Sequence, residues 1–388
     1  MIRHRLERIL ARRCTLLCVG PMSVNCIDAT IELANDYEIP VTLIASRRQI
    51  DSVEFGGGYV NNWATPQFAE YVIKHDRKGK VLLARDHGGP WQNPKEVDNR
   101  LSLRLAMESA KTSYRTDIES GFQILHIDPS VDMFGKPDID EIHERIFELY
   151  DYCWSYAQRA GHDILFEIGT EEQSGSTNRL DELGYTLSAV QKFCKKNNIP
   201  LPLFVVIQNG TRVMETRNVG SFDLHVRVAD EIPPEIQVPK MVELCNRFGI
   251  FMKVHNTDYL SDESLQWHPR LGIHAANVAP EFGVAETIAL VSIMEEKGLK
   301  DLADGFLSVA YASGKWEKWI ISDSNISDRD KAILAGHYVF SHRDCVNIIT
   351  KASKQLMKTG FNLNQYLKDQ IKISILRYIR NFRLMRSV

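Results

Sequence analysis

Short apolar runs alternate with longer segments of helical periodicity along roughly the first 280 residues of the chain. Eight of the runs have the length and composition of strands, and most of them stop at Gly, Pro, Asn or Asp. They lie at Thr15–Pro21, Val41–Ser46, Val81–Trp91, Ile124–Ser130, Ile164–Glu171, Leu203–Gly210, Ile250–Asp258 and Leu271–Pro280. The pattern therefore predicts eight successive units of strand and helix.

Eight such units predict the α/β class and a (β/α)8 TIM barrel with extra C-terminal helices. A doubly wound open sheet is the competing architecture, but it does not require eight strands, and no G-x-G-x-x-G follows the first run. We expect residues 1–285 to form the barrel. Residues 286–388 lack strand-like runs and are expected to form a helical extension that packs on the barrel or on a partner.

The last helical segment, Asn364–Met385, carries an apolar stripe surrounded by Lys and Arg. Two interpretations fit this pattern. The helix docks its apolar side on the body of the protein or on a second subunit, or it contacts a membrane surface or a nucleic acid.

Composition narrows the class of protein. With 388 residues, of which 44% are hydrophobic and 25% charged, the chain is long enough for a large core, and its formal charge of −3 gives no reason to expect nucleic acid as a partner. No apolar run could span a membrane, and no export signal opens the chain, so we expect a cytoplasmic location. The seven cysteines are dispersed, with no C-x-x-C pair, and are expected to be reduced core residues.

Polar side chains gather where the predicted strands end, and in a barrel these ends converge on one mouth. Because side chains alternate along a strand, we expect Arg85 to share a face with His87, His126 with Asp128, Glu167 with Glu171, and Lys253 with His255. The complete set of polar residues at the strand ends is Arg85, Asp86, His87, His126, Asp128, Glu167, Glu171, Glu172, Gln208, Asn209, Lys253, His255, Asp258, His274 and Asn277.

Two histidines from different strands, together with carboxylates, form a ligand set suited to zinc or a similar divalent ion. In the alternative interpretation each histidine is a hydrogen-bonded structural residue, and Glu167 forms a buried ion pair with Lys253 or Arg85. The clustering at one mouth favours a metal site.

Several segments also resemble a known family. EFGGGY, RDHGGPW, HIDPS, EIGTE, VVIQNG and VHNTDY follow one another between Gln49 and Asn277. They resemble, in the same order, the family described as the accessory, non-catalytic subunit of class II D-tagatose-1,6-bisphosphate aldolase. That family is similar to the class II, zinc-dependent ketose-bisphosphate aldolases, which are (β/α)8 barrels.

The resemblance implies roles for individual residues. Asp86 matches the catalytic acid/base, and His87 and His255 match metal ligands. Glu171 is the expected third ligand, with Glu172 as the alternative. The complete expectation is catalytic Asp86, Glu172 and Asn277, a divalent metal, expected to be zinc, on His87, Glu171 and His255, and substrate contacts from Arg85, Asp128, Gln208, Lys253 and His274.

Three positions depart from the related families. Pro280 stands where the aldolases have a Thr that helps to hold a substrate phosphate, and it has no N–H to donate. Gly88 and Lys253 also differ from the accessory family. A substrate without a phosphate, or with a larger activated group, would fit these changes.

Three functions follow as hypotheses. The first is a metal-dependent aldolase-type lyase that acts on a ketose or ketose phosphate through an enediolate, with Asp86 as acid/base; the same retro-aldol chemistry would support a sugar C4-epimerase. The second is a Schiff-base aldolase with Lys253 as nucleophile. The third is a silent subunit that stabilises a catalytic aldolase. The expected assembly is a homo-oligomer or a complex with that aldolase.

Overall fold

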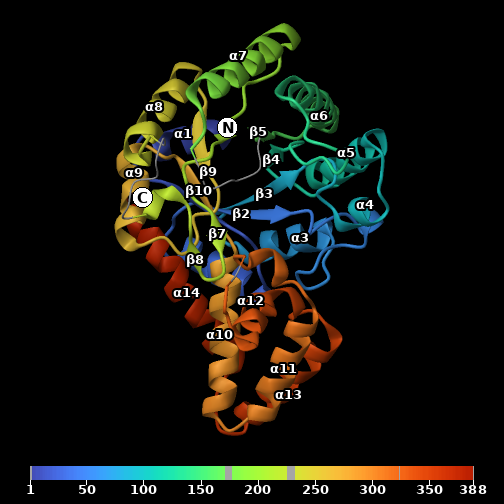
Figure 1. Cartoon of the computed structure of the whole chain (residues 1–388), viewed down its shortest axis with the longest axis vertical. Helices are drawn as coiled ribbons and strands as arrows, with labels where there is room; N and C mark the ends of the chain where they lie inside the picture. Colours follow the sequence, from blue (N-terminus) through green and yellow to red (C-terminus); the bar gives the residue numbers. More distant parts are fainter. Residues whose placement is uncertain (1, 171–176, 225–231, 323, 388) are drawn as a thin grey trace.

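A closed barrel of eight parallel strands forms the centre of the molecule (Figure 1). The structure is a computed structural model that describes residues 2–170, 177–224, 232–322 and 324–387. The strands in order are β1 (Leu16–Val19), β2 (Val41–Ser46), β3 (Val81–Gly88), β4 (Ile124–Ile127), β5 (Leu165–Ile168), β6 (Phe204–Val206), β9 (Phe251–Val254) and β10 (Ala275–Val278). β10 pairs with β1 and closes the barrel. The predicted (β/α)8 fold is confirmed, and the open sheet is wrong.

Helices connect consecutive strands, as the sequence pattern predicts. They are α2 (Val24–Asp36), α3 (Thr65–His75), α4 (Pro94–Asp98) with α5 (Leu103–Glu119), α6 (Ile139–Ala160), α7 (Leu180–Asn197), α8 (Pro234–Arg247) and α9 (Asp262–Leu271). A small hairpin that the sequence analysis does not predict, β7 (Val213–Met214) with β8 (Arg217–Asn218), follows β6.

The side chains that point into the barrel change character along the strands. Towards the amino ends they are apolar and form one buried cluster, which includes Leu82, Ile124, Leu165 and Phe204. Nearer the carboxyl ends, several inward positions are polar, among them Asp86 of β3, His126 of β4, Glu167 of β5 and Asn277 of β10. The barrel is thus filled by hydrophobic packing below and by ionisable groups at its carboxyl end.

The N-terminal helix α1 (Ile2–Leu10) closes the amino end of the barrel. Its Leu6 and Leu10 are buried in the same apolar cluster as the inward residues of the strands. Because this end is sealed, the carboxyl end is the open mouth of the barrel.

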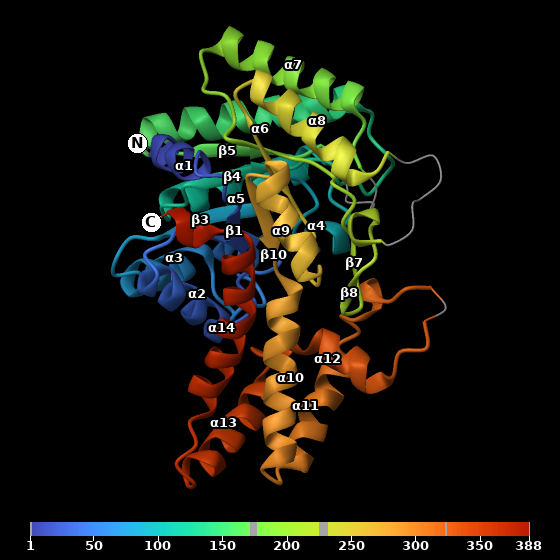
Figure 2. The same cartoon turned by 90° about the vertical axis from the view of Figure 1, so that its left-hand side faces the viewer.

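The C-terminal helix α14 (Leu363–Asn381) packs against α2, α9 and α10 (Pro280–Glu296) and so completes the ring of helices around the barrel (Figure 2). Its residues Ile371, Ile375, Tyr378 and Ile379 are part of the main core. Its charges are also used locally, since Lys368 and Lys372 both pair with Glu32. This helix docks on the body of the protein, as the first of the two interpretations predicts.

Three further helices form an arm on one side of the barrel. They are α11 (Lys300–Ala312), α12 (Asp328–Val339) and α13 (Arg343–Met357), and with the later turns of α10 they share a separate apolar core (Figure 2). The predicted boundary at residue 285 falls inside α10, which runs from the barrel into this arm.

Two smaller predictions concern the chain as a whole. All seven cysteines are buried and free, as expected of reduced core residues. Among the described helices, none is both long enough and apolar enough to span a membrane.

The docking of α14 gives a direct test of the fold. Ile375 is fully buried, whereas Ile373, on the same helix, is 63% exposed. Ile375→Ala removes packed atoms from the main core and should lower the free energy of unfolding by about 2–5 kcal/mol. Ile373→Ala should change it by less than about 0.5 kcal/mol. Urea unfolding followed by circular dichroism measures both, and equal effects would contradict the docking of this helix.

Candidate active site

A break in the alternation of β3 brings Asp86 and His87 to the same place. The pairing of β3 with β4 shifts register between Arg85 and Gly88, and His87 has a left-handed backbone with φ of 42°. Such a conformation is costly for a residue other than glycine and is typical of functional positions. As a result, Asp86 and His87 both face the cluster at the mouth, although they are consecutive in the strand.

The ring of His87 is held by a carboxylate. Its Nδ1 lies 2.7 Å from Oδ2 of Asp128, whose Oδ1 accepts a hydrogen bond from the Ser130 hydroxyl at 2.6 Å. With Nδ1 engaged in this way, Nε2 is the nitrogen left to face the site, 3.9 Å from Oδ2 of Asp86. A carboxylate behind a histidine is the arrangement that commonly orients metal-binding histidines.

Four ionisable side chains lie close together at the centre of the mouth, one each from β3, β4 and β5 and one after β9. Nε2 of His255 lies 3.8 Å from Oδ1 of Asp86 and 3.6 Å from Oε1 of Glu167. Nδ1 of His126 lies 3.7 Å and 3.6 Å from the same two oxygens. All four residues are buried, and their ligand atoms lie within 4.8 Å of one another. Tetrahedral zinc ligands lie roughly 3.4 Å apart, so these spacings suit a metal ion.

Several buried atoms of this cluster have no hydrogen-bond partner within the described part of the chain. They are both ring nitrogens of His255, Oε1 of Glu167, Nε2 of His126 and Oδ1 of Asn277. A buried polar atom without a partner costs about 1–3 kcal/mol, so a group of them around one point is typical of a site that binds an ion or a polar ligand. The residues present therefore fit a bound cation, and the buried cluster is able to hold one.

The pKa values of His255 and His87 are consistent with a bound cation. Burial lowers the pKa of His255 to about 4, so its ring is neutral and has a nitrogen lone pair to offer. Burial has the same tendency at His87, but the carboxylates of Asp86 and Asp128 outweigh it and raise the pKa of His87 to about 9. The surroundings of His87 thus favour a positive charge, whether a proton or a metal ion.

Lys253 is paired rather than free. Its Nζ donates to Oε2 of Glu167 at 2.7 Å, and both side chains are buried. Burial lowers the pKa of the amine, but Glu167 outweighs this effect and raises it to about 12. A protonated, ion-paired amine cannot attack a carbonyl, which argues against the Schiff-base hypothesis.

The structure brings together most of the residues that the sequence places in the site. Nδ2 of Asn277 donates to Oδ1 of Asp86 at 3.1 Å, and Gln208 lines a neighbouring cavity of about 780 Å³ that Ser130 also lines. Glu171 and Glu172, the expected third ligand and its alternative, lie outside the described residues. The residues that meet at the mouth are Asp86, His87, Asp128, Lys253, His255 and Asn277.

Arg85 lies on the other face of its strand. Its guanidinium forms hydrogen bonds of 2.6 and 2.8 Å to the buried Asp117 of α5, outside the barrel. The expectation that Arg85 shares a face with His87 is wrong, because the bulge rotates His87 away from the regular alternation. Arg85 therefore fixes a helix to the barrel and does not reach the mouth.

His274 lies at the opposite end of the barrel. It immediately precedes β10, and its Nδ1 accepts a hydrogen bond from the Met252 amide at 3.2 Å. Its ring packs against Phe251, one of the residues at the apolar end. The predicted β-run began too early, because Leu271 still belongs to α9.

The sequence analysis gave His126 no role of its own, and it gave Glu167 an ion pair with Lys253 or Arg85, of which the pair with Lys253 is confirmed. Both residues lie at the centre of the cluster. The alternation of His126 with Asp128 in HIDPS was the available signal, since both turn out to face the site. Gly169 gives a second signal: a Cβ there would come within 2.6 Å of His126 Nε2, so only glycine leaves room for this ring.

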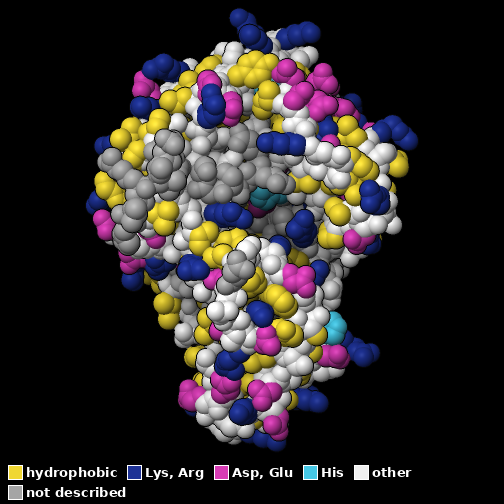
Figure 3. Space-filling view, viewed as in Figure 1, with side chains coloured by type: hydrophobic (Ala, Val, Ile, Leu, Met, Phe, Trp, Pro, Cys, Tyr) yellow, Lys and Arg dark blue, Asp and Glu magenta, His cyan; other side chains and the backbone are white. Residues whose placement is uncertain are grey.

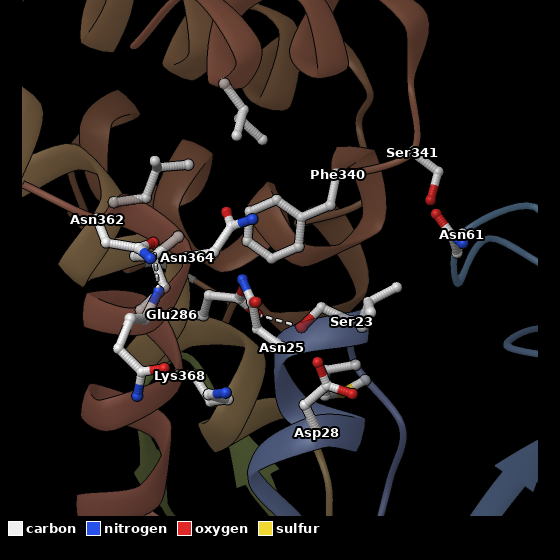
Figure 4. Close-up of a pocket in the computed structure, with 16 residues that line it drawn as sticks. Ser23, Asn25, Asp28, Asn61, Glu286, Phe340, Ser341, Asn362, Asn364 and Lys368 are labelled. Atoms are coloured by element: carbon white, nitrogen blue, oxygen red, sulfur yellow. Dashed lines mark hydrogen bonds between the residues drawn. The ribbon is translucent and has the colours of Figure 1, made fainter. Parts of the chain in front are cut away.

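Another cavity, of about 510 Å³, lies between the start of α2 and the helical arm (Figure 4). Its most buried ionisable group is Glu286 of α10, which accepts hydrogen bonds from the Ser23 hydroxyl and, at 2.8 Å, from Asn25 Nδ2. None of the residues predicted for the active site lines this cavity. Its described contacts give it a structural role, joining α10 to α2.

Comparison with known proteins shows the fold. No protein-family profile and no curated protein matches the sequence. A probable tagatose 6 phosphate kinase from Sinorhizobium meliloti 1021 shares 16% identity at a TM-score of 0.73, over 95% of this chain and 100% of that one. A fructose-bisphosphate aldolase from Campylobacter jejuni shares 10% sequence identity at a TM-score of 0.57, over 100% of this chain and 95% of that one. The fructuronate-tagaturonate epimerase UxaE from Cohnella laeviribosi shares 11% sequence identity at a TM-score of 0.59, over 96% of this chain and 81% of that one.

At these identities the likeness establishes a shared architecture and no more. The chain is a (β/α)8 barrel of the shape found in an aldolase and in a sugar-acid epimerase. Membership of the accessory-subunit family stays a prediction.

The buried Glu286 predicts a pH dependence of stability. Burial raises its pKa to about 7, from a usual value of 4.5. Because the folded state favours the protonated acid, stability falls as pH rises from about 4.5 to 7, by up to about 3 kcal/mol. Glu286→Gln should therefore raise the thermal unfolding midpoint at pH 8 and leave it unchanged at pH 4. The exposed Glu296→Gln on the same helix is the control, and a gain of equal size at both pH values would refute the assignment.

Proposed function

We propose that this protein is a metal-dependent enzyme that breaks or makes a carbon–carbon bond in a sugar by aldol chemistry, as an aldolase or as a C4-epimerase. The observation that carries the proposal is the buried cluster of Asp86, His126, Glu167 and His255, in which Glu167 Oε1 and both ring nitrogens of His255 have no partner among the described residues. The half-buried ring of His87 lies beside it, 4.8 Å from the ring of His255. The barrels of the aldolase and of the epimerase support the same chemistry by analogy of fold.

His87 and His255 would hold the metal through Nε2, with a carboxylate as third ligand. Glu167 offers its unpaired Oε1 for this role, and Glu171 remains the alternative suggested by the sequence. Zinc is the metal that we propose, because two imidazoles and one carboxylate leave a fourth position open for substrate. When bound, such an ion acts as a Lewis acid that polarises a carbonyl and stabilises negative charge on the adjoining oxygens.

Asp86 is suited to move the proton. Although burial favours its neutral form, His87, His126 and His255 together hold its pKa well below the usual range, so it is a carboxylate at neutral pH. Asn277 fixes Oδ1 of Asp86 and leaves Oδ2 to accept a proton from a substrate hydroxyl as the carbon–carbon bond breaks. Return of that proton to the alkoxide after the bond re-forms on the other face of the aldehyde completes an epimerisation. In a cleavage the aldehyde leaves without the proton, and protonation of the enediolate carbon, by Asp86 or by solvent, gives the ketone product.

Asn277 also orients the substrate in this proposal. Its amide donates to Asp86, while its buried Oδ1 has no partner among the described residues and can accept a hydrogen bond from a sugar hydroxyl. Lys253 acts through Glu167: the ion pair keeps that carboxylate ionised and aimed at the cluster.

Metal content is the first test. Elemental analysis of the protein, purified without a chelator or a polyhistidine tag, should find about one divalent ion per chain. His87→Ala and His255→Ala should lose that ion, because each removes a ligand nitrogen. His274→Ala is the matched control: it removes a histidine at the other end of the barrel and should keep the metal.

Wild type without metal, even after exposure to zinc and dialysis, would contradict the assignment of the site. Loss of metal in His274→Ala to the same extent as in His255→Ala would show that the loss reports misfolding.

Asp86→Asn tests the chemistry separately. The amide keeps the shape and the contact with Asn277 but cannot accept a proton, so turnover should fall by about 10²–10⁴-fold while the metal stays bound. Ketose phosphates and ketouronates are screened for cleavage, by coupled detection of the aldehyde, and for inversion at C4, by NMR. If the wild type is active and Asp86→Asn is equally active, Asp86 is not the acid/base. If the wild type is active without any metal, the proposed mechanism is wrong.

A further inference from the structure

The usual anion site of this fold is already filled by the chain itself. In (β/α)8 barrels a substrate phosphate is often held by the loops after strands seven and eight and by a helix N-terminus. Here Oδ1 of the buried Asp258, which follows β9, accepts hydrogen bonds of 2.9 Å from the amides of Ala279 and Glu281 at the start of α10. Pro280, between them, has no amide hydrogen to offer.

A second acid adds to this obstruction. Glu281 directs its carboxylate back to the same turn, where Oε2 accepts a hydrogen bond from the Tyr259 amide. Burial and the charge of Glu281 raise the pKa of Asp258 to about 7, so these surroundings disfavour negative charge. Asp258 and Glu281, the latter paired with Arg377, thus occupy this turn, so we expect the anionic group of a substrate to bind elsewhere.

Two strands further round the mouth lies a cavity with the opposite character. It has a volume of about 590 Å³, which is within the usual range for small-molecule sites, and it is formed by the loops after β2 and β3 and by the α11–α12 connection. Its cationic side chains include Arg48 and Lys95 from the barrel loops and Lys315 and Lys318 from the arm.

The positive charge of this cavity is not compensated. None of these four side chains forms a salt bridge with a carboxylate in the described ranges, whereas the nearby Arg47 is neutralised by Asp51 and Glu96. Asp98 and Glu317 also line the cavity, which still leaves two more cations than anions among the unpaired groups.

Lys318 shows the crowding of charge directly. Its Nζ lies over the rings of Trp319 and Tyr338, 4.5 and 5.4 Å from their centroids. Although the Lys318 side chain is exposed, local desolvation of its ammonium group, followed by repulsion from Arg48 and Lys315, lowers its pKa to about 8. An anion between these side chains would relieve that repulsion.

The walls of the cavity are held in place by contacts between barrel and arm. The Ser341 hydroxyl donates to the carbonyl of Tyr59 at 2.8 Å, and the rings of Tyr59 and Tyr338 pack edge to face at 4.9 Å. Gly56 makes room for one of the cations, since a Cβ there would come within 2.9 Å of Lys95 Nζ. Figure 3 shows several Lys and Arg side chains near the rim of a separate, central hollow, in which a histidine is visible.

We propose that this cavity binds an anionic substituent of the sugar substrate, a phosphate or a carboxylate, and that Lys315 and Lys318 make the helical arm part of the substrate site. The identity of the ligand as a substrate rests on the proposed function. In this proposal the cavity takes over anion binding from the N-terminus of α10, which Asp258 occupies. It also explains why Pro280 can stand where the aldolases have a phosphate-binding Thr.

The test measures binding without requiring turnover. Isothermal titration of the full-length protein at fixed ionic strength uses inorganic phosphate, D-fructose 6-phosphate, D-fructose and D-glucuronate as probes. Phosphate and the sugar phosphate should bind, D-fructose should bind more weakly, and Lys318→Gln should weaken the anionic probes by about tenfold or more. Lys351→Gln, an exposed lysine of α13 that does not line the cavity, is the control and should bind like the wild type.

Each outcome decides a separate question. Equal affinities in the wild type and in Lys318→Gln, or no binding of any anion by the wild type, would overturn the inference. Tighter binding of glucuronate than of phosphate, lost in Lys318→Gln, would identify a carboxylate as the natural group. If the wild type binds anions but contains no metal, the assignment of the cavity stands and the proposed function is refuted. If the wild type contains metal but binds no anion, the proposed function stands and the inference about the cavity is refuted.

Discussion

The structure depends on where a closed barrel places its inward-pointing side chains. Every second residue of each strand points to the axis, where neighbouring strands leave no room for water at the sealed end. Those positions must be apolar near α1, and Leu82, Ile124, Leu165 and Phe204 satisfy this requirement. Only near the open mouth can ionisable groups occupy the same register, and there Asp86, His126 and Glu167 replace the hydrophobic side chains.

Concentrating charge at the mouth is expensive, and the fold contains features that offset the cost. Lys253 balances Glu167, Asp128 balances His87, and Arg85 with Asp117 ties α5 to the outside of β3. Buried pairs of this kind seldom add stability on balance, so the hydrophobic core and the ring of helices, completed by α14, must provide it. The cluster at the mouth keeps unpaired atoms that a purely structural network would have satisfied.

Most of the fold could be predicted from the sequence, because the eight apolar runs and the helices between them are local patterns. The return of α14 to the barrel was only one of two interpretations, since an apolar stripe does not say what covers it. In the site, Asp86 and His255 followed from strand ends, but strict alternation misplaced Arg85 because a bulge at His87 has no sequence signal of its own. The grouping of His126 with Glu167 depends on strand register, which only the three-dimensional structure provides.

Strand register also limits where the barrel can place side chains, and this limit gives the helical arm its role. A barrel strand can place a ligand only at its own end, so a site that extends beyond the strand ends needs walls from elsewhere. Here the α11–α12 connection supplies Lys315 and Lys318, and Tyr338 and Ser341 fix it against the loop after β2. With Asp258 filling the amide groups at the start of α10, positive charge has moved from the backbone of a helix to side chains of an added element. Because a side chain of a connecting segment can be replaced without moving the barrel backbone, an anion site built from the arm would allow its ligand preference to change while the barrel stays the same.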